Sequence, residues 1–153
     1  MHEALFYQRI GDNGVICGLC NHRCQIAAGK RGRCGVRENR AGQLVSLVYG
    51  QLVSQNIDPI EKKPLFHFLP GSRSLSIATV GCNFQCLHCQ NYQISQYPSL
   101  HDGKITGTVC SPQSVVEAAV SCALVRTLFS PTLAASTPRR LFSVILDADF
   151  PTP

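Results

Sequence analysis

Three cysteines, Cys82, Cys86 and Cys89, lie in the short stretch GCNFQCLHCQN with the spacing C-x3-C-x2-C. A structural zinc site or a closed iron–sulfur cluster takes four protein ligands, whereas three thiolates leave one metal position open. On a [4Fe–4S] cluster the open iron can bind a small molecule through nitrogen and oxygen donors. The amino and carboxylate groups of S-adenosylmethionine (SAM) supply such donors and bring its sulfonium to the cluster. The spacing therefore predicts an oxygen-sensitive [4Fe–4S] cluster with one iron free for SAM.

Two plainer interpretations of the same triplet stay open. The three cysteines are small and apolar enough to be ordinary buried residues. Alternatively, they are ligands of a zinc ion whose fourth ligand is His88 or a distant residue.

A second group of cysteines precedes the triplet, in the stretch CGLCNHRCQIAAGKRGRCGVR. Cys17, Cys20, Cys24 and Cys34 supply four soft ligands on a glycine-rich segment, which suits zinc or a second iron–sulfur cluster. His22 could replace one thiolate, and free, merely buried cysteines are the alternative. A closed site of this kind indicates a structural role rather than chemistry.

The remaining polar and cysteine side chains carry weaker signals. The basic residues around the second group form either a docking face or, as we expect, a solvated surface. Cys110 and Cys122 are expected to be apolar fillers, and His67 a packed histidine. The acidic and basic residues of the stretch DPIEKK either line the mouth of a site or form a solvated turn. These two charged sets are Lys30, Arg31, Arg33, Arg37 and Arg40, and Asp58, Glu61, Lys62 and Lys63.

Composition limits the cellular setting of these sites. The chain has 153 residues, nine cysteines and a formal net charge of +5. Its first residues show no basic segment followed by an apolar one, so we expect no signal peptide and a reducing cytoplasm without disulfides. No apolar run reaches the length of about 18 residues that a transmembrane helix needs. The positive charge is too dispersed to favour a nucleic-acid partner.

The elements around the cysteines predict how they are positioned. Residues 17–37 have no helical or strand period, and residues 43–54 form short strands around a turn at Gly50. A proline-containing connector precedes a buried strand at 74–80, so the triplet lies in the loop that leaves this strand. A helix begins with Ser111 as N-cap and Pro112 as its first residue. Strand, loop and helix in this order indicate a βα-repeat architecture with the chemistry at the strand ends.

Several of these stretches together resemble the radical SAM enzymes, and within them the radical SAM member of the AmmeMemoRadiSam system, a relative of the activating enzymes of pyruvate formate-lyase. The resemblance rests on the two cysteine stretches and on DPIEKKPLFHFLPGS, and covers about residues 1–122. It implies an α/β fold in which a partial (β/α) barrel follows a small cysteine-rich module. It also implies reductive cleavage of SAM to methionine and a 5′-deoxyadenosyl radical, which takes hydrogen from an unidentified substrate. His88, just before the third cysteine, is implied to lie near the SAM adenine. A reductase or a flavodoxin-type protein would supply the electron.

The likeness weakens after residue 122. Where the family reads approximately Tyr-Thr-Tyr-x-Glu-Pro-Thr, this chain has RTLFSPT. Thr127 matches and is implied to help hold SAM, but Ser130 replaces the glutamate. A (β/α)8 barrel takes about 250 residues. We therefore expect an incomplete barrel, an N-terminal fragment of the enzyme, and weak SAM binding with little turnover.

The expected organisation has four parts. Residues 1–56 form the cysteine-rich module, 57–73 a connector, 74–132 the start of the radical SAM core and 133–153 a divergent tail. Two other functions stay open: a zinc-ribbon-like binding module in which every cysteine is structural, and an iron–sulfur electron carrier without SAM chemistry.

Overall fold

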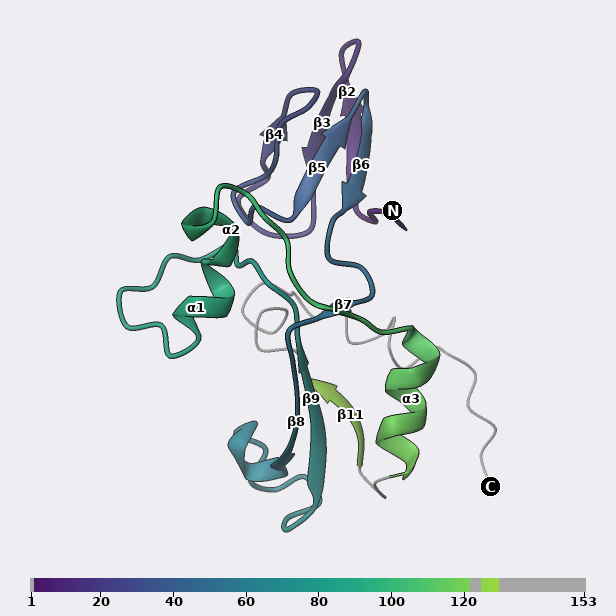
Figure 1. Cartoon of the computed structure of the whole chain (residues 1–153), viewed down its shortest axis with the longest axis vertical. Helices are drawn as coiled ribbons and strands as arrows, with labels where there is room; N and C mark the ends of the chain where they lie inside the picture. Colours follow the sequence, from purple (N-terminus) through teal and green to yellow (C-terminus); the bar gives the residue numbers. More distant parts are fainter. Residues whose placement is uncertain (1, 122–124, 130–153) are drawn as a thin grey trace.

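The computed structural model describes residues 2–121 and 125–129, which form several small β-sheets and a few short helices (Figure 1). Two three-stranded sheets lie at one end of the molecule. A third, with one helix beside it, lies at the other end. The segment that carries the cysteine triplet runs between the two ends. The candidate site therefore lies between the N-terminal sheets and the sheet at the other end.

The N-terminal half consists of two antiparallel sheets, with strand orders β2-β3-β4 and β1-β6-β5. The turn between β5 and β6 has positive φ at both Ala41 and Gly42, the geometry that two-residue hairpins require. The sheets enclose an apolar core that includes Val15, Leu44 and Ile26. The strands are β1 His2–Glu3, β2 Tyr7–Ile10, β3 Gly14–Cys17, β4 Gln25–Ile26, β5 Arg37–Arg40 and β6 Gln43–Ser46.

Asn39 connects these strands from inside the core. Its side chain is fully buried, and its amide nitrogen donates to the carbonyls of Asn13 and Ile26, both at 2.7 Å. Its amide oxygen accepts the backbone N–H of Gly42 at 2.8 Å. A buried amide with its hydrogen bonds made costs little and fixes the strands relative to one another. This frame supports the turns that carry the first cysteine group.

The other half is built on strand β9, Arg73–Ala78, which lies between β8, Ser54–Pro59, and β11, Val125–Phe129. β8 pairs antiparallel with β9, and β11 pairs parallel with it. Helix α3, Pro112–Ser121, contributes Val115 and Ala119 to the core around Leu75. The predicted strand at 74–80 is confirmed, as is the helix start: the Ser111 hydroxyl accepts the backbone N–H of Ser114 at 3.0 Å. Strand β8 crosses the boundary expected between residues 56 and 57.

Short elements connect the two halves. β7, Gln51–Leu52, pairs antiparallel with β10, Thr108–Val109, and a 3-10 helix covers Ile60–Lys62. After the cysteine triplet come two single-turn helices, α1 Tyr92–Ser95 and α2 Tyr97–Leu100.

The predicted fold class, the start of a partial (β/α) barrel, is wrong. The described residues form mainly small antiparallel sheets with few helices, and no (β/α) barrel pattern is present in them. β8 occupies one side of β9 as an antiparallel strand, where a barrel would need a parallel neighbour. The segment between the triplet and α3 forms only the single-turn helices α1 and α2, the two-residue strand β10 and loops.

Candidate metal centre

The cysteine triplet lies in the loop between β9 and α1. The last buried apolar residue before the loop is Val80, which is 1% exposed, and Gly81 follows with φ +91°. The backbone N–H of Gly81 donates to the carbonyl of Ile94 in α1 at 3.2 Å, so both ends of the loop are tied together. The loop is thereby anchored at its base, while Leu87 near its tip is 98% exposed.

The three thiols have different surroundings within this loop. Cys82 is half-buried, and its Sγ accepts the backbone N–H of Phe84 at 3.4 Å. The Cys89 Sγ lies 3.3 Å from the hydroxyl of Ser95, a buried residue of α1. Cys86 is exposed. All three thiols are free, which leaves them available as ligands.

The first cysteine group lines a cavity of about 210 Å³ at the edge of the N-terminal sheets. Cys17 ends β3, Cys20 and Cys24 lie in the turn before β4, and Cys34 lies in the turn before β5. The cavity also has Cys82 in its wall, so the two cysteine groups meet there. Across residues 2–121 and 125–129, no set of three or more His, Cys, Asp or Glu side chains is already positioned around a common point that could hold a metal ion.

Arg37 and Cys34 define the electrostatics of this cavity. The buried guanidinium of Arg37 donates from Nη1 to the Cys17 Sγ at 2.9 Å and from Nη2 to the carbonyl of Leu5. Burial raises the pKa of the Cys34 thiol, because the low-dielectric surroundings disfavour the thiolate. The cavity therefore combines thiols with a buried cation.

Two contacts join the N-terminal cysteine segment to the triplet loop. The Nε2 of His22 lies 2.8 Å from the carbonyl oxygen of Asn83, and the His22 ring meets the Phe84 ring edge-on. A Cβ on Gly81 would lie 2.4 Å from the Val36 side chain. The sequence indicated His22 only as an alternative metal ligand and did not predict its contact with Asn83. Its only signal was its place between cysteines.

The remaining SAM-related predictions concern His88 and Thr127. His88 is exposed on the loop. Thr127 belongs to β11, next to β9, but the structure does not describe its side chain. Ser130, the position of the missing glutamate, lies outside the described residues, as do Cys122 and the tail 133–153.

In the DPIEKK stretch, Asp58 and Lys63 are buried and form an ion pair, whereas Lys62 is exposed to solvent. Asp58 accepts Lys62 Nζ at 2.7 Å, Lys63 Nζ at 2.7 Å and the Ser76 hydroxyl at 2.6 Å. These partners, Lys62 first, hold the pKa of Asp58 far below its ordinary value. A cavity of about 150 Å³ separates this network from Gln90 and from other residues after the triplet. The sequence signal was the lysine four residues after Asp58, on the same side of a turn.

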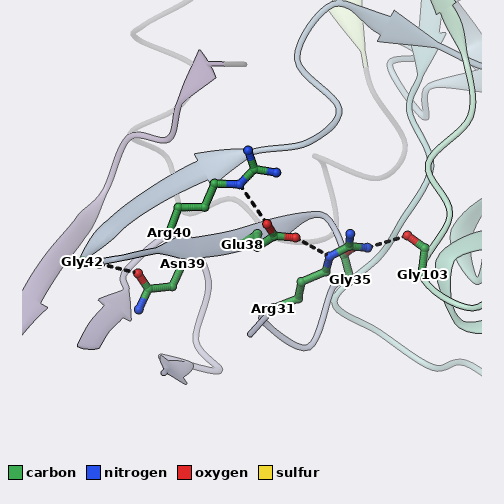
Figure 2. A network of polar contacts seen from close by, with 7 residues as sticks. All are labelled: Arg31, Gly35, Glu38, Asn39, Arg40, Gly42 and Gly103. Atoms are coloured by element: carbon green, nitrogen blue, oxygen red, sulfur yellow. Dashed lines mark hydrogen bonds and ion pairs between the residues drawn. The ribbon is translucent and has the colours of Figure 1, made fainter. Parts of the chain in front are cut away.

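The basic residues near the first cysteine group make specific contacts (Figure 2). Arg31 and Arg40 each place Nε 2.9 Å from a different oxygen of Glu38, and Arg31 also donates to the carbonyl of Gly103. Arg31, followed by Arg40, lowers the pKa of Glu38. Arg31 and Arg40 are exposed, as expected for a solvated surface, whereas that expectation is wrong for buried Arg37.

The exposure of Cys110 and His67 tests the expectation that both side chains are packed. The side chain of Cys110 packs beside the core around Leu75, as expected for an apolar filler, and its Sγ lies 3.2 Å from the Ser114 hydroxyl. His67 is exposed, so its expected packing is wrong. Within the described part of the chain, no helix has the length and apolarity that crossing a bilayer requires.

Comparisons with known proteins give one relative and no function. An uncharacterized protein of Methanocaldococcus jannaschii is 48% identical over 120 residues. The match covers 78% of this chain and 35% of the relative, so the chain spans about a third of the length of the relative it matches. No protein-family model and no solved structure matches.

Proposed function

We propose that Cys82, Cys86 and Cys89 hold a [4Fe–4S] cluster whose fourth iron binds SAM, and that the chain belongs to an enzyme that cleaves SAM reductively. The observation that carries this proposal is the C-x3-C-x2-C spacing on a loop that leaves a buried strand. Three free thiols on one anchored loop fit a three-ligand cluster. When bound, the cluster supplies the electron that splits SAM into methionine and a 5′-deoxyadenosyl radical.

Residues of the loop have distinct tasks in this proposal. The Phe84 N–H and the Ser95 hydroxyl lie near the sulfurs of Cys82 and Cys89. Hydrogen bonds to ligand sulfurs stabilise the more negative, reduced cluster and raise its potential. His88 is assigned to the SAM adenine on the resemblance to the radical SAM enzymes, and it is exposed directly before the third ligand. Thr127, on the strand beside β9, is assigned to the polar end of SAM.

The chemistry also defines the partners. A reductase or a flavodoxin-type protein donates the electron, and an organic substrate, small molecule or protein, donates the hydrogen atom. An exposed open cluster is sensitive to oxygen, so we place the protein in the reducing cytoplasm. The exposed cluster loop gives an electron donor access, since Leu87 is 98% exposed and Cys86 lies beside it.

One observation favours the alternative, a zinc-ribbon-like binding module. Cys82 lines the same cavity as the four N-terminal cysteines, whereas Cys86 and Cys89 do not line it. In that case Cys82 would serve the N-terminal metal and no cluster would form. An electron carrier without SAM chemistry would form the cluster but ignore SAM.

We expect Cys86→Ala to abolish the [4Fe–4S] cluster. The 153-residue chain and the variant are reconstituted with iron and sulfide without oxygen, and metal content and visible absorption are measured. Cys110→Ala is the matched control, because Cys110 packs beside the core around Leu75 and does not line the cysteine cavity. The wild type and the control should hold the cluster. Unchanged absorption in Cys86→Ala would contradict the assignment.

Addition of SAM to the reduced protein then separates an open cluster from an electron carrier. We expect SAM to change the electron paramagnetic resonance spectrum of the cluster, because it becomes a ligand of one iron. An identical spectrum with and without SAM would favour the electron carrier.

A further inference from the structure

The cavity between the N-terminal sheets and the triplet loop is lined by more thiols than the proposed cluster uses. We propose that Cys17, Cys20, Cys24 and Cys34 bind one Zn²⁺ ion there, and that this zinc site positions the loop residues around Cys82. The zinc site does not depend on the proposed function. Only the idea that a positioned loop helps to hold the [4Fe–4S] cluster rests on the proposed function.

The donor set fits zinc in number and in kind. Four thiols from three neighbouring backbone segments line a single cavity of about 210 Å³. Zn²⁺ in structural sites takes four such ligands in a tetrahedron, so no further residue is needed. Backbone bonds already hold the segments together: the N–H of Cys17 donates to the carbonyl of Cys24 at 2.9 Å, and the N–H of Arg23 to that of Cys20 at 3.2 Å. The thiols do not yet converge, so binding requires rotation of cysteine side chains.

Arg37 is the second, independent observation. Its guanidinium is buried and bonded to Cys17, and no carboxylate in the described part of the chain pairs with it. A buried cation without a counter-charge is costly. Four thiolates around Zn²⁺ carry a net charge of about −2, which Arg37 would offset. Its hydrogen bond to Cys17 is also the kind of outer contact that orients metal ligands.

Residues of the N-terminal cysteine segment that surround the cavity contact the triplet loop directly. The carbonyl oxygen of Cys34 lies 2.8 Å from where a Cβ of Gly81 would be, directly before Cys82. On the other side, His22, between Cys20 and Cys24, meets the Asn83 carbonyl at 2.8 Å. The backbone of Cys82 is thus flanked on one side by Cys34, a proposed zinc ligand, and on the other by His22, which lies between two more. Ordering these ligands would restrict the loop.

The first test measures zinc in the 153-residue chain after anaerobic loading with Zn²⁺ and removal of excess metal. We expect about one zinc per wild-type chain and per Cys86→Ala chain, and almost none for Cys20→Ser or Cys24→Ser. Arg37→Gln should bind zinc about 10-fold more weakly. Wild-type protein without stoichiometric zinc would overturn the proposal, even if the serine variants fail to fold.

Two further outcomes would overturn the ligand assignment. Loss of zinc in Cys82→Ser would make Cys82 a ligand. After anaerobic iron and sulfide reconstitution, persistent cluster absorption in the triple variant Cys82→Ser, Cys86→Ser, Cys89→Ser would show iron and sulfide at the N-terminal cysteines. Zinc binding with no cluster at the triplet would refute the proposed function and leave this site standing.

The second test measures positioning by the rate at which a thiol reagent alkylates Cys82, read by mass spectrometry. We expect zinc loading to slow alkylation of Cys82 several-fold, with less effect on exposed Cys86. His22→Ala should keep its zinc but restore fast alkylation, and His22→Gln, whose amide can donate to the Asn83 carbonyl, should slow it again. An alkylation rate of Cys82 that is the same with and without zinc would refute the positioning. Loss of zinc in His22→Ala would show that His22 is a ligand.

Discussion

At the scale of single residues, Asp58 holds a buried cation in place near the candidate site. The Lys63 side chain is 7% exposed and its Nζ pairs with Asp58, whereas the Lys62 side chain is 64% exposed. Ser76 of β9 donates to the same carboxylate, which joins the network to the strand that leads into the triplet loop. The exposed Lys62–Asp58 pair contributes little to the free energy of unfolding. Removal of one partner of the buried Lys63–Asp58 pair is strongly destabilising, because the other charge stays buried.

Asp58→Asn is therefore expected to lower the free energy of unfolding by about 3–5 kcal/mol, because it leaves the Lys63 ammonium buried without a counter-charge. Lys62→Gln is the matched control and should cost at most about 1 kcal/mol, since Lys62 is solvated. Urea unfolding followed by circular dichroism measures both. Equal effects of the two substitutions would contradict the distinction between buried and exposed pairs.

The same residue predicts a pH dependence. Its lysine partners lower the pKa of Asp58 in the folded state, so the unfolded state binds the proton more tightly. The stabilisation is complete above the ordinary carboxyl pKa of about 4 and is lost as the pH falls below it toward the lowered folded value. In Asp58→Asn, the decline of stability with falling pH between about 5 and 3 should be shallower. Parallel curves for both proteins would contradict this.

At the scale of elements, the loop after β9 depends on one glycine. Gly81 has φ +91°, and a Cβ there would lie 2.4 Å from Val36 Cγ1 and 2.8 Å from the carbonyl oxygen of Cys34. Both the backbone conformation and the space exclude a side chain. The loop can contact the N-terminal module only because residue 81 has none.

Gly81→Ala should thus destabilise the protein by more than backbone strain alone. Gly71→Ala is a matched control, because Gly71 has φ +77° with no atom within 4 Å of the added Cβ. We expect the control to lose about 1–2 kcal/mol from strain and Gly81→Ala to lose about 1–3 kcal/mol more from overpacking. Urea titrations of both variants give the comparison, and a cost no greater than the control's would refute the close contact.

At the scale of the whole molecule, the described residues contain two separate apolar cores. One lies between the N-terminal sheets around Val15 and Leu44, and the other between β9 and α3 around Leu75 (Figure 1). Links between the halves are local, among them the β7–β10 pair and the contact of Arg31 with Gly103. Two cores with few links can open independently.

Removal of zinc should consequently loosen one half only. Hydrogen exchange of zinc-loaded and chelator-treated protein should show lost amide protection in β3 to β6, whose turns hold the proposed ligands, and retained protection in β8 and β9. Chelation of the Cys24→Ser variant should change nothing, since it lacks the site. Equal loss of protection in both halves would contradict independent cores.

The sequence by itself determined the local features. The alternation of apolar residues before Gly81 and the Ser111-Pro112 start are encoded within a few neighbouring residues, so strand β9 and helix α3 could be predicted. The cysteine spacing, likewise local, defined the candidate ligands. Only the tertiary structure decided that β8 lies antiparallel to β9, which overturned the barrel. It also decided that Cys82 borders the cavity of the first cysteine group, and that Arg37 is buried there. These depend on pairing between distant segments, and neither periodicity nor motif spacing specifies which segments meet.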